Sequence, residues 1–584
     1  MDALTSPVRG NWRDKTTQWI AAHPKWTLAL LAVIALGPFL AKPYNMDDPL
    51  FVWTARQIHA HPWNPYGFNV NWYGRVEPMF GVTKNPPLAS YYLALAAGVL
   101  GWSETALHLA FLLPALAAIL GTYRLARHFC DQPLLAALAT LFTPVFLVSS
   151  TSVMCDVLML AFWVWAVVLW VEGIERDAFW PLAGAGLLMA LAALTKYFGA
   201  CLIPLLAVYG LMSKRRFGSW AASLLIPLLA LFAYEWATRT LYQHALMSEA
   251  AYYTSRWNPL LGSLFAGDRA AAGLTVLKAG DRAAAGFTAL TFTGGCLATA
   301  IFLAPWLWRA RTLLALAGGV AVAAFALFSE GTLLHAYGWI HGWPRFSMEA
   351  QIIFWTAGGV SVAALAVADV WKRRDARSWL LALWIMGTFV FTAGFNWSVN
   401  GRSILPMAPV VGILLARRLQ QRAGANEKNP AVGRRGILMA LAAGALFAFL
   451  VALSDFLFAA AARQSAVQTS GRHGQAGHTL WFEGHWGFQY YLEKLGGQAL
   501  DMRHPGLRDG DVLAVPLNNT NLNPPPAPSG AFYVSGPRFL ADMNLYIGAG
   551  FYSSSDGPLP FVLGHVPPEN IIIHVWKTGP ANDK

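Results

Sequence analysis

The chain has 584 residues, of which 56% are hydrophobic and only 12% are charged. Soluble globular proteins carry about 25% charged residues, so this composition excludes an ordinary soluble enzyme and predicts many membrane-spanning helices. The formal net charge of +12 does not indicate nucleic-acid binding, because no basic cluster alternates with exposed aromatic residues in a soluble segment.

Apolar segments long enough to cross a bilayer, which takes roughly 20 residues, recur along most of the chain. We expect thirteen spans, at residues 26–42, 105–123, 133–150, 157–172, 179–195, 197–212, 219–238, 286–307, 312–328, 350–370, 379–395, 403–416 and 437–461. An odd number of spans places the two ends of the chain on opposite faces. The apolar stretch 88–101 is too short to span and is typical of an interfacial helix.

The basic residues support this order of spans. A basic leader precedes the first span, and alternate loops carry the remaining clusters, among them Lys214-Arg215-Arg216, Lys372-Arg373-Arg374 and Arg434-Arg435. Because cytoplasmic loops are enriched in Lys and Arg, we expect a multi-pass protein of the inner (plasma) membrane. Its outer-face loops are then 43–104, 239–285 and 329–349.

From about residue 463 the composition becomes that of a soluble protein. Alternating apolar residues predict strands at Thr479–Phe482, Asp511–Val515, Ala531–Val534 and Ile571–Trp576, with a helix near Phe488–Lys494. We therefore expect a membrane domain over residues 1–462 and a small extracytoplasmic α/β domain over 463–584. The four cysteines show no CxxC spacing for a zinc or redox site.

The outer face carries an unusual set of ionisable residues. Asp47 and Asp48 follow the first span, Asp156 opens the fourth, and three cations lie at the same expected level, namely Lys84, Lys196 and Arg402. Ionisable groups at span ends usually face a cavity in the helix bundle. The cations suit a lipid-anchored phosphate, and a carboxylate beside them suits a general base. The set fits removal of a sugar from a lipid phosphate.

Each of these residues also has a structural interpretation. Asp47 and Asp156 precede or open helices and could serve as N-terminal caps, whereas Asp48 could fix the turn into Pro49. Lys196 and Arg402 could extend along apolar surface towards water. Lys84 and Glu77 could be ordinary solvated loop charges. Among the tryptophans, Trp53, Trp63 and Trp72 lie where they could stack on a sugar ring.

These motifs, in this order, resemble a known family. An Asp-Asp pair follows span one, Lys84-Asn85-Pro86-Pro87-Leu88 precedes a Tyr-Tyr helix, and Leu194-Thr195-Lys196 and Arg402-x-x-Leu405-Pro406 come later. The set resembles the protein O-mannosyltransferase and lipid A aminoarabinose transferase group, glycosyltransferase family 39, which has the GT-C membrane fold. The resemblance covers about residues 26–420. In one departure, the cation before the Pro is shifted by one position, or Asn85 replaces it.

The resemblance implies inverting transfer from a polyprenyl-phosphate sugar to a lipid, glycan or protein acceptor on the exported face. It implies that Asp47 is the catalytic base, aided by Asp156 and with Asp48 adjacent. Lys84, Lys196 and Arg402 would hold the leaving phosphate, and Asn85 and Glu77 complete the expected substrate-binding set. We expect no cofactor and no nucleic-acid partner.

Three alternatives stay open at this point. A divalent metal could bind His244, His335 and His341 with Glu77 or Glu249. The chain could instead be a polytopic transporter or lipid flippase, although it shows no repeat of its spans. It could also be a non-catalytic scaffold that presents the C-terminal domain, although such a scaffold leaves the outer-face charges unexplained.

Overall fold

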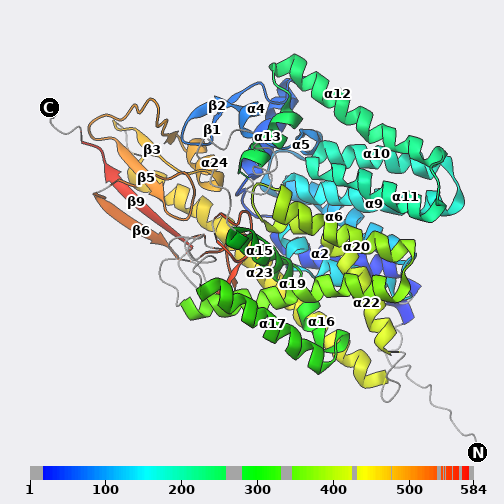
Figure 1. Cartoon of the computed structure of the whole chain (residues 1–584). Coiled ribbons are helices and arrows are strands. Elements are labelled where there is room, and N and C mark those ends of the chain that lie inside the picture. The colour runs from blue at the N-terminus through cyan, green and yellow to red at the C-terminus, as the bar shows by residue number, and fades with distance from the viewer. Residues whose placement is uncertain are drawn as a thin grey trace, which may run out of the picture.

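The computed structural model describes residues 18–20, 22–257, 279–329, 345–423, 430–474, 477–525, 527–535, 541–543, 545, 548–555, 557–564 and 568–577. A bundle of helices forms most of the molecule, and a mixed β-sheet lies at one end of it (Figure 1). This arrangement confirms the expected helical, multi-pass class with a small C-terminal α/β region.

The helices up to the second outer loop are α2 (Pro24–Leu36), α3 (Asp48–Ala60), α4 (Met79–Val82), α5 (Leu88–Leu100), α6 (Glu104–Ala126), α7 (Pro133–Leu141), α8 (Pro144–Ser150), α9 (Cys155–Arg176), α10 (Phe179–Thr195), α11 (Leu202–Lys214), α12 (Leu225–Tyr242) and α13 (Leu246–Trp257). The later helices are α15 (Ala279–Cys296), α16 (Thr299–Leu307), α17 (Ala310–Ser329), α19 (Arg345–Arg373), α20 (Ala376–Val390), α21 (Gly401–Ile404), α22 (Met407–Ala423), α23 (Pro430–His473) and α24 (Trp486–Lys494).

Length and composition bound the number of spans. Within the described residues, seven helices are long and apolar enough to cross a membrane, and the number rises to nine if each of two bent pairs counts as one span. Other expected spans fall on shorter apolar helices, such as α10 and the segment Pro24–Phe39. The helix α12 lies at the edge of the bundle (Figure 1) and exposes Leu229, Phe232 and Trp236, as a lipid-facing surface requires. The total of thirteen spans stays a prediction.

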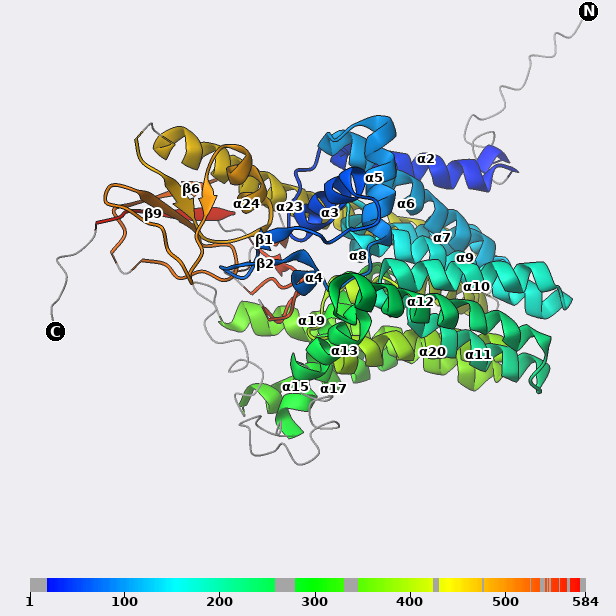
Figure 2. The same cartoon turned by 90° about the horizontal axis from the view of Figure 1, so that it is seen from above.

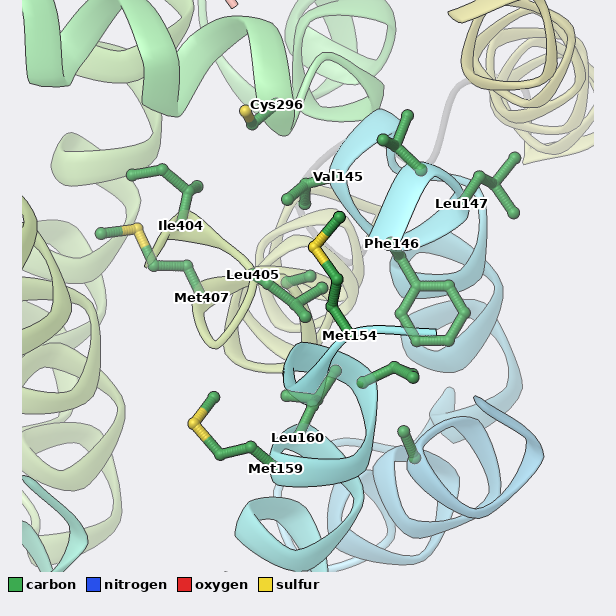
Figure 3. Packing of buried hydrophobic residues seen from close by; sticks show 14 of the residues in the cluster. Val145, Phe146, Leu147, Met154, Met159, Leu160, Cys296, Ile404, Leu405 and Met407 are labelled. Atoms are coloured by element: carbon green, nitrogen blue, oxygen red, sulfur yellow. The ribbon is translucent and has the colours of Figure 1, made fainter. Parts of the chain in front are cut away.

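Two expected spans are broken helices. The pair α7 and α8 bends by 64°, and Ala284–Cys296 and α16 bend by 88°. Pro144 explains the first bend, because proline cannot donate a hydrogen bond to the preceding turn, and Thr143 caps the new helix through Phe146 N (3.3 Å). Buried apolar residues of α8, the start of α9 and the segment Ile404–Met407 pack around these breaks (Figure 3).

The C-terminal segment is built on a mixed sheet with strand order β4-β3-β5-β9-β6. Its strands are β3 (Leu480–Phe482), β4 (Gln498–Ala499), β5 (Val512–Pro516), β6 (Gly530–Val534) and β9 (Glu569–Val575). β3 pairs in parallel with β4 and β5, while β9 is antiparallel to β5 and β6. The four expected strands and the expected helix are all present, whereas the sequence did not predict β4, β7 (Ala541–Asp542) and β8 (Val562–Leu563), each of two residues.

A single helix joins the bundle to this sheet. α23 has 44 residues and is therefore about 66 Å long at 1.5 Å per residue, well over the roughly 30 Å of a bilayer core. The expected boundary at residue 463 falls inside α23, and the first strand begins only at Leu480.

The C-terminal segment packs against the loop 43–104 (Figure 2). That loop contains a hairpin of β1 (Asn69–Asn71) and β2 (Val76–Pro78). Tyr44 N donates to Tyr491 Oη (2.8 Å), Gly487 N donates to Asn45 Oδ1 (3.2 Å), and Gln489 Nε2 donates to Asn71 O (2.8 Å). The C-terminal segment is thus fastened directly to the loop that carries Asp47.

Single cysteines test the expected topology at three exposed positions. Trp63, Phe217 and Tyr533 are 88%, 74% and 65% exposed, so Trp63→Cys, Phe217→Cys and Tyr533→Cys in a background without the native cysteines should fold normally. In right-side-out vesicles, an impermeant maleimide should label positions 63 and 533 at once, and position 217 only after permeabilisation. Labelling of position 533 only after permeabilisation contradicts an odd number of spans.

Candidate functional site

The loop 43–104, α13, α21 and the C-terminal segment enclose a cavity of about 320 Å³. Four of the expected site residues line it, namely Asp47, Lys84, Asn85 and Arg402. The C-terminal segment contributes Trp486, Thr520, Asn521, Tyr552, Ser553 and Ser555. The cavity therefore combines charged groups from the membrane domain with mostly neutral polar groups from the C-terminal segment.

A local chain reversal directs Asp47 towards Arg402. Met46 adopts φ of 49°, in the left-handed region that non-glycine residues rarely occupy. Asp47 then sits just before α3, but its side chain makes no capping hydrogen bond. Instead, Asp47 Oδ2 accepts a hydrogen bond from Arg402 Nη1 at 2.7 Å. Among the described residues Oδ1 has no such partner, so the capping interpretation of Asp47 does not account for its orientation.

Arg402 is held in the cavity wall both by its helix and by contacts of its side chain. Asn400 Oδ1 accepts from Ser403 N (2.8 Å) and so caps the short helix α21 that carries Arg402. Arg402 Nη1 also lies 3.0 Å from Met154 Sδ, and its guanidinium carbon lies 5.6 Å from the centre of the Tyr552 ring. The Arg402 side chain is only 14% exposed, so it is packed in the protein and does not extend along a lipid-facing surface.

Lys84 and Asn85 form another part of the same wall. Lys84 Nζ donates to Gly81 O (2.6 Å) and lies 5.1 Å from the centre of the Tyr253 ring. Burial lowers the pKa of Lys84 from its ordinary value, an effect that Glu249 and Glu77 partly oppose. Asn85 O accepts from Tyr66 Oη (2.8 Å), which fixes the turn before Pro86.

Asp156 and Lys196 form a separate ion pair next to this cavity. Lys196 Nζ donates to Asp156 Oδ1 at 2.7 Å, and the side chains are 17% and 1% exposed. Neither residue lines the cavity itself. Asp156 lies two residues beyond Met154, and Met154 contacts Arg402. The Asp156–Lys196 pair is therefore connected to Asp47 only through Met154 and Arg402. Asp156 Oδ2 is buried and has no hydrogen-bond partner among the described residues.

Asp48 does not reach the cavity. It is 1% exposed, and its carboxylate accepts from two backbone groups, Asn45 N (3.1 Å) and Val153 N (2.9 Å). Burial raises the pKa of Asp48 to about 7, although Lys42 and these backbone groups favour the charged form. Its geometry matches the turn-fixing interpretation, because it fastens the first loop to the segment before α9.

Glu77 also lies away from the cavity. It sits on β2, where its carboxylate pairs with Arg75 (2.5 Å) and with Arg503 of the C-terminal segment (3.6 Å). Of the tryptophans singled out from the sequence, Trp72 lines the cavity and Trp53 packs edge-on against it. Trp63 is 88% exposed and makes no part of the site.

The structure describes only part of the expected metal-binding set. His335 and His341 lie outside the described residues. His244 Nδ1 contacts Glu249 Oε1 at 2.6 Å, and the described residues contain no group of three or more potential ligands.

A buried network, which the sequence reasoning missed, leads from the bundle to the cavity. Lys42 Nζ pairs with Asp455 Oδ2 where both side chains are 2% exposed, and Tyr552 Oη donates to Asp455 Oδ1 (2.8 Å). Tyr552 then packs on Arg402, which pairs with Asp47. A charged residue within the apolar stretch 437–461 was the available signal, because a charge in such a segment requires a partner.

Comparison with known proteins identifies the class. Residues 84–236 match the family of dolichyl-phosphate-mannose-protein mannosyltransferases. This match confirms the resemblance expected from the sequence over the segment that contains Lys84, Asn85, Asp156 and Lys196. It indicates that the chain is a glycosyltransferase with a multi-pass membrane domain. The comparison with curated proteins found no match to the chain.

Solved structures give weaker likenesses. ArnT from Cupriavidus metallidurans bound to undecaprenyl phosphate has a TM-score of 0.47 at 14% identity, over 86% of this chain and 93% of that one. The apo oligosaccharyltransferase of Archaeoglobus fulgidus has the same score and identity, over 82% and 65% of the two chains. ArnT in the apo state gives 0.39 at 15% identity, over 86% and 93%.

Breaking the Lys42–Asp455 pair should destabilise the whole protein. Loss of one partner of a buried pair leaves an uncompensated charge and costs about 3–5 kcal/mol, so Lys42→Met should clearly lower the melting temperature in detergent. The double variant Lys42→Met/Asp455→Leu should regain much of the loss. Asp177→Asn is the matched control, because it breaks the Lys214–Asp177 pair in which Asp177 is 83% exposed. Equal melting temperatures for Lys42→Met and the control contradict this role.

Proposed function

We propose that the protein transfers a sugar from a polyprenyl-phosphate donor to an acceptor on the exported face, with inversion at the anomeric carbon and with Asp47 as the general base. The observation that carries the proposal is the Asp47–Arg402 pair, held at 2.7 Å in the wall of a cavity that Lys84 also lines. The family match supports the donor class, because its members are described as dolichyl-phosphate-mannose-dependent enzymes.

The chemistry needs a base and an anion site within one small volume. An acceptor hydroxyl or amine attacks the anomeric carbon from the side opposite the phosphate, and Asp47 takes its proton. The bond between that carbon and the phosphate oxygen breaks, and its electron pair leaves on the polyprenyl phosphate. Because the new bond forms on the opposite side, the configuration at the anomeric carbon inverts.

The cations stabilise the leaving group. Negative charge grows on the phosphate as the bond breaks, and fixed cations in a partly buried site stabilise it more than water does. Arg402 suits this role because it lines the cavity and, among the described residues, its guanidinium donates hydrogen bonds only through Nη1. Lys84 supplies a second charge. Asp156 and Lys196 support the site from beside it, since their mutual ion pair positions the segment that contacts Arg402.

Asp47→Asn tests the base directly. The variant keeps the size of the side chain but cannot take the proton, so turnover of a polyprenyl-phosphate sugar should fall by about 10²–10⁴-fold, with the melting temperature unchanged. Asp48→Asn is the matched control: it removes a structural acceptor and should lower stability more than turnover per folded molecule. The measurement is the turnover of purified Asp47→Asn and Asp48→Asn with a panel of polyprenyl-phosphate monosaccharides. Near-normal product from Asp47→Asn would leave Asp156 as the next candidate base.

Removal of a cation from the cavity should change the kinetic parameters for the donor more than those for the acceptor. Arg402→Ala and Lys84→Ala each remove a charge that faces the phosphate, so the KM for the donor should rise and kcat should fall, with the KM for the acceptor less changed. Lys196→Ala should have a smaller effect on the donor, because its ammonium is engaged by Asp156. Arg503→Ala, which removes a 54% exposed cation outside the cavity, is the control. Donor kinetics equal to those of the control contradict the phosphate site.

A further inference from the structure

The loop after β5 separates anchoring residues from residues that face the cavity. It contains four consecutive polar residues, Asn518, Asn519, Thr520 and Asn521. The first two are tied to other parts of the C-terminal segment, and the last two line the cavity of Asp47 and Arg402. Nothing in the donor chemistry described above uses this loop.

Asn518 anchors the start of the loop with both ends of its amide. Asn518 Nδ2 donates to Pro568 O (2.8 Å), and Asn518 Oδ1 accepts from Leu545 N (2.8 Å). Its backbone N donates to Oε1 of Glu569 (2.8 Å), a β9 residue that is 3% exposed. These bonds fix the loop to the sheet.

Asn519 fastens the loop to the segment that precedes α24. Its Oδ1 accepts from His485 N (2.8 Å), and its Nδ2 donates to His485 O (3.1 Å). The next residue, Trp486, adopts φ of 61° and lines the cavity. The pairing of Asn519 with His485 therefore brings two cavity-lining segments into one rigid unit.

Thr520 and Asn521 present unused polar groups to the cavity. Neither side chain hydrogen-bonds to the described part of the chain, although both anchors before them are fully engaged. Asn521 adopts φ of 54°, a left-handed conformation that Asn tolerates better than most residues. A loop held so firmly, with two side chains left free and one strained backbone position, is typical of a ligand-contacting segment.

We propose that Thr520 and Asn521 form a subsite that binds the hydroxyl groups of a sugar ring in this cavity; the inference rests on the function proposed above. Hydroxyl groups both donate and accept hydrogen bonds, and so do the Thr hydroxyl and the Asn amide. The opposite wall, with Asp47, Lys84 and Arg402, carries the charges that phosphate and proton transfer require. The C-terminal segment thus selects the sugar, while the membrane domain performs the transfer.

Two sources of such a ring exist in the reaction, the donor sugar and a glycan acceptor. Both present the same chemistry to the loop. Because the hydrogen bonds of Asn518 and Asn519 already fix the loop, a sugar that binds to it does not have to order it first.

Binding measurements with and without the sugar test the proposal. We would measure the affinity of the purified protein for undecaprenyl phosphate and for a panel of undecaprenyl-phosphate monosaccharides. Asn521→Gly removes the amide yet accommodates the left-handed backbone, and Thr520→Val removes the hydroxyl at nearly constant shape. Each variant should bind the undecaprenyl-phosphate monosaccharide about fivefold more weakly than the wild-type protein does, which is the value of one neutral hydrogen bond. The affinity for bare undecaprenyl phosphate should be unchanged.

Asn523→Gly is the matched control, because Asn523 belongs to the same loop but does not line the cavity. If the ring belongs to the acceptor, the same two variants should instead raise the acceptor KM about fivefold with donor binding intact. Donor and acceptor parameters equal to those of Asn523→Gly overturn the subsite. Failure of the proposed function gives a different result, in which the wild-type protein binds neither form of the lipid, and that result overturns both proposals.

Discussion

The buried ion pair of Lys42 and Asp455 is the interaction on which the rest of the site depends. The two residues are 413 positions apart, at the end of the first apolar segment and inside α23. Since an unpaired buried charge costs several kcal/mol, α23 must pack where these two side chains meet. The helix then carries the sheet to the loop 43–104, and Asp455 accepts a hydrogen bond from Tyr552, whose ring packs on Arg402.

The cavity is assembled from two parts of the chain with different chemistry. The membrane domain supplies the carboxylate and the cations, whereas the C-terminal segment supplies hydroxyl, amide and aromatic groups. Met46, Trp486 and Asn521, three of the non-glycine residues with positive φ, all line it. Such conformations cost about 1–3 kcal/mol each and persist only where the surroundings hold them, so the packing around the cavity must hold three strained positions in its wall.

Neighbouring residues of the sequence have separate roles in the structure. Asp47 and Asp48 are adjacent, but the reversal at Met46 directs Asp47 into the cavity while Asp48 binds the backbone of Asn45 and Val153. Glu77 shares a loop with Lys84 but lies on a hairpin that contacts Arg503. The order of charges along the sequence could suggest a site, but it could not say which side chain of a pair would face it.

The sequence alone determined the helical membrane class, the positions of most helices and the four main strands of the C-terminal sheet. These features depend on local apolar content and periodicity, which a single sequence displays directly. Only the tertiary structure decided which charges pair, where two helices bend, and that the C-terminal segment completes the cavity. Contacts such as Tyr44–Tyr491 and Tyr552–Arg402 join residues more than a hundred positions apart. Their geometry follows from how the elements pack, and no local pattern encodes it.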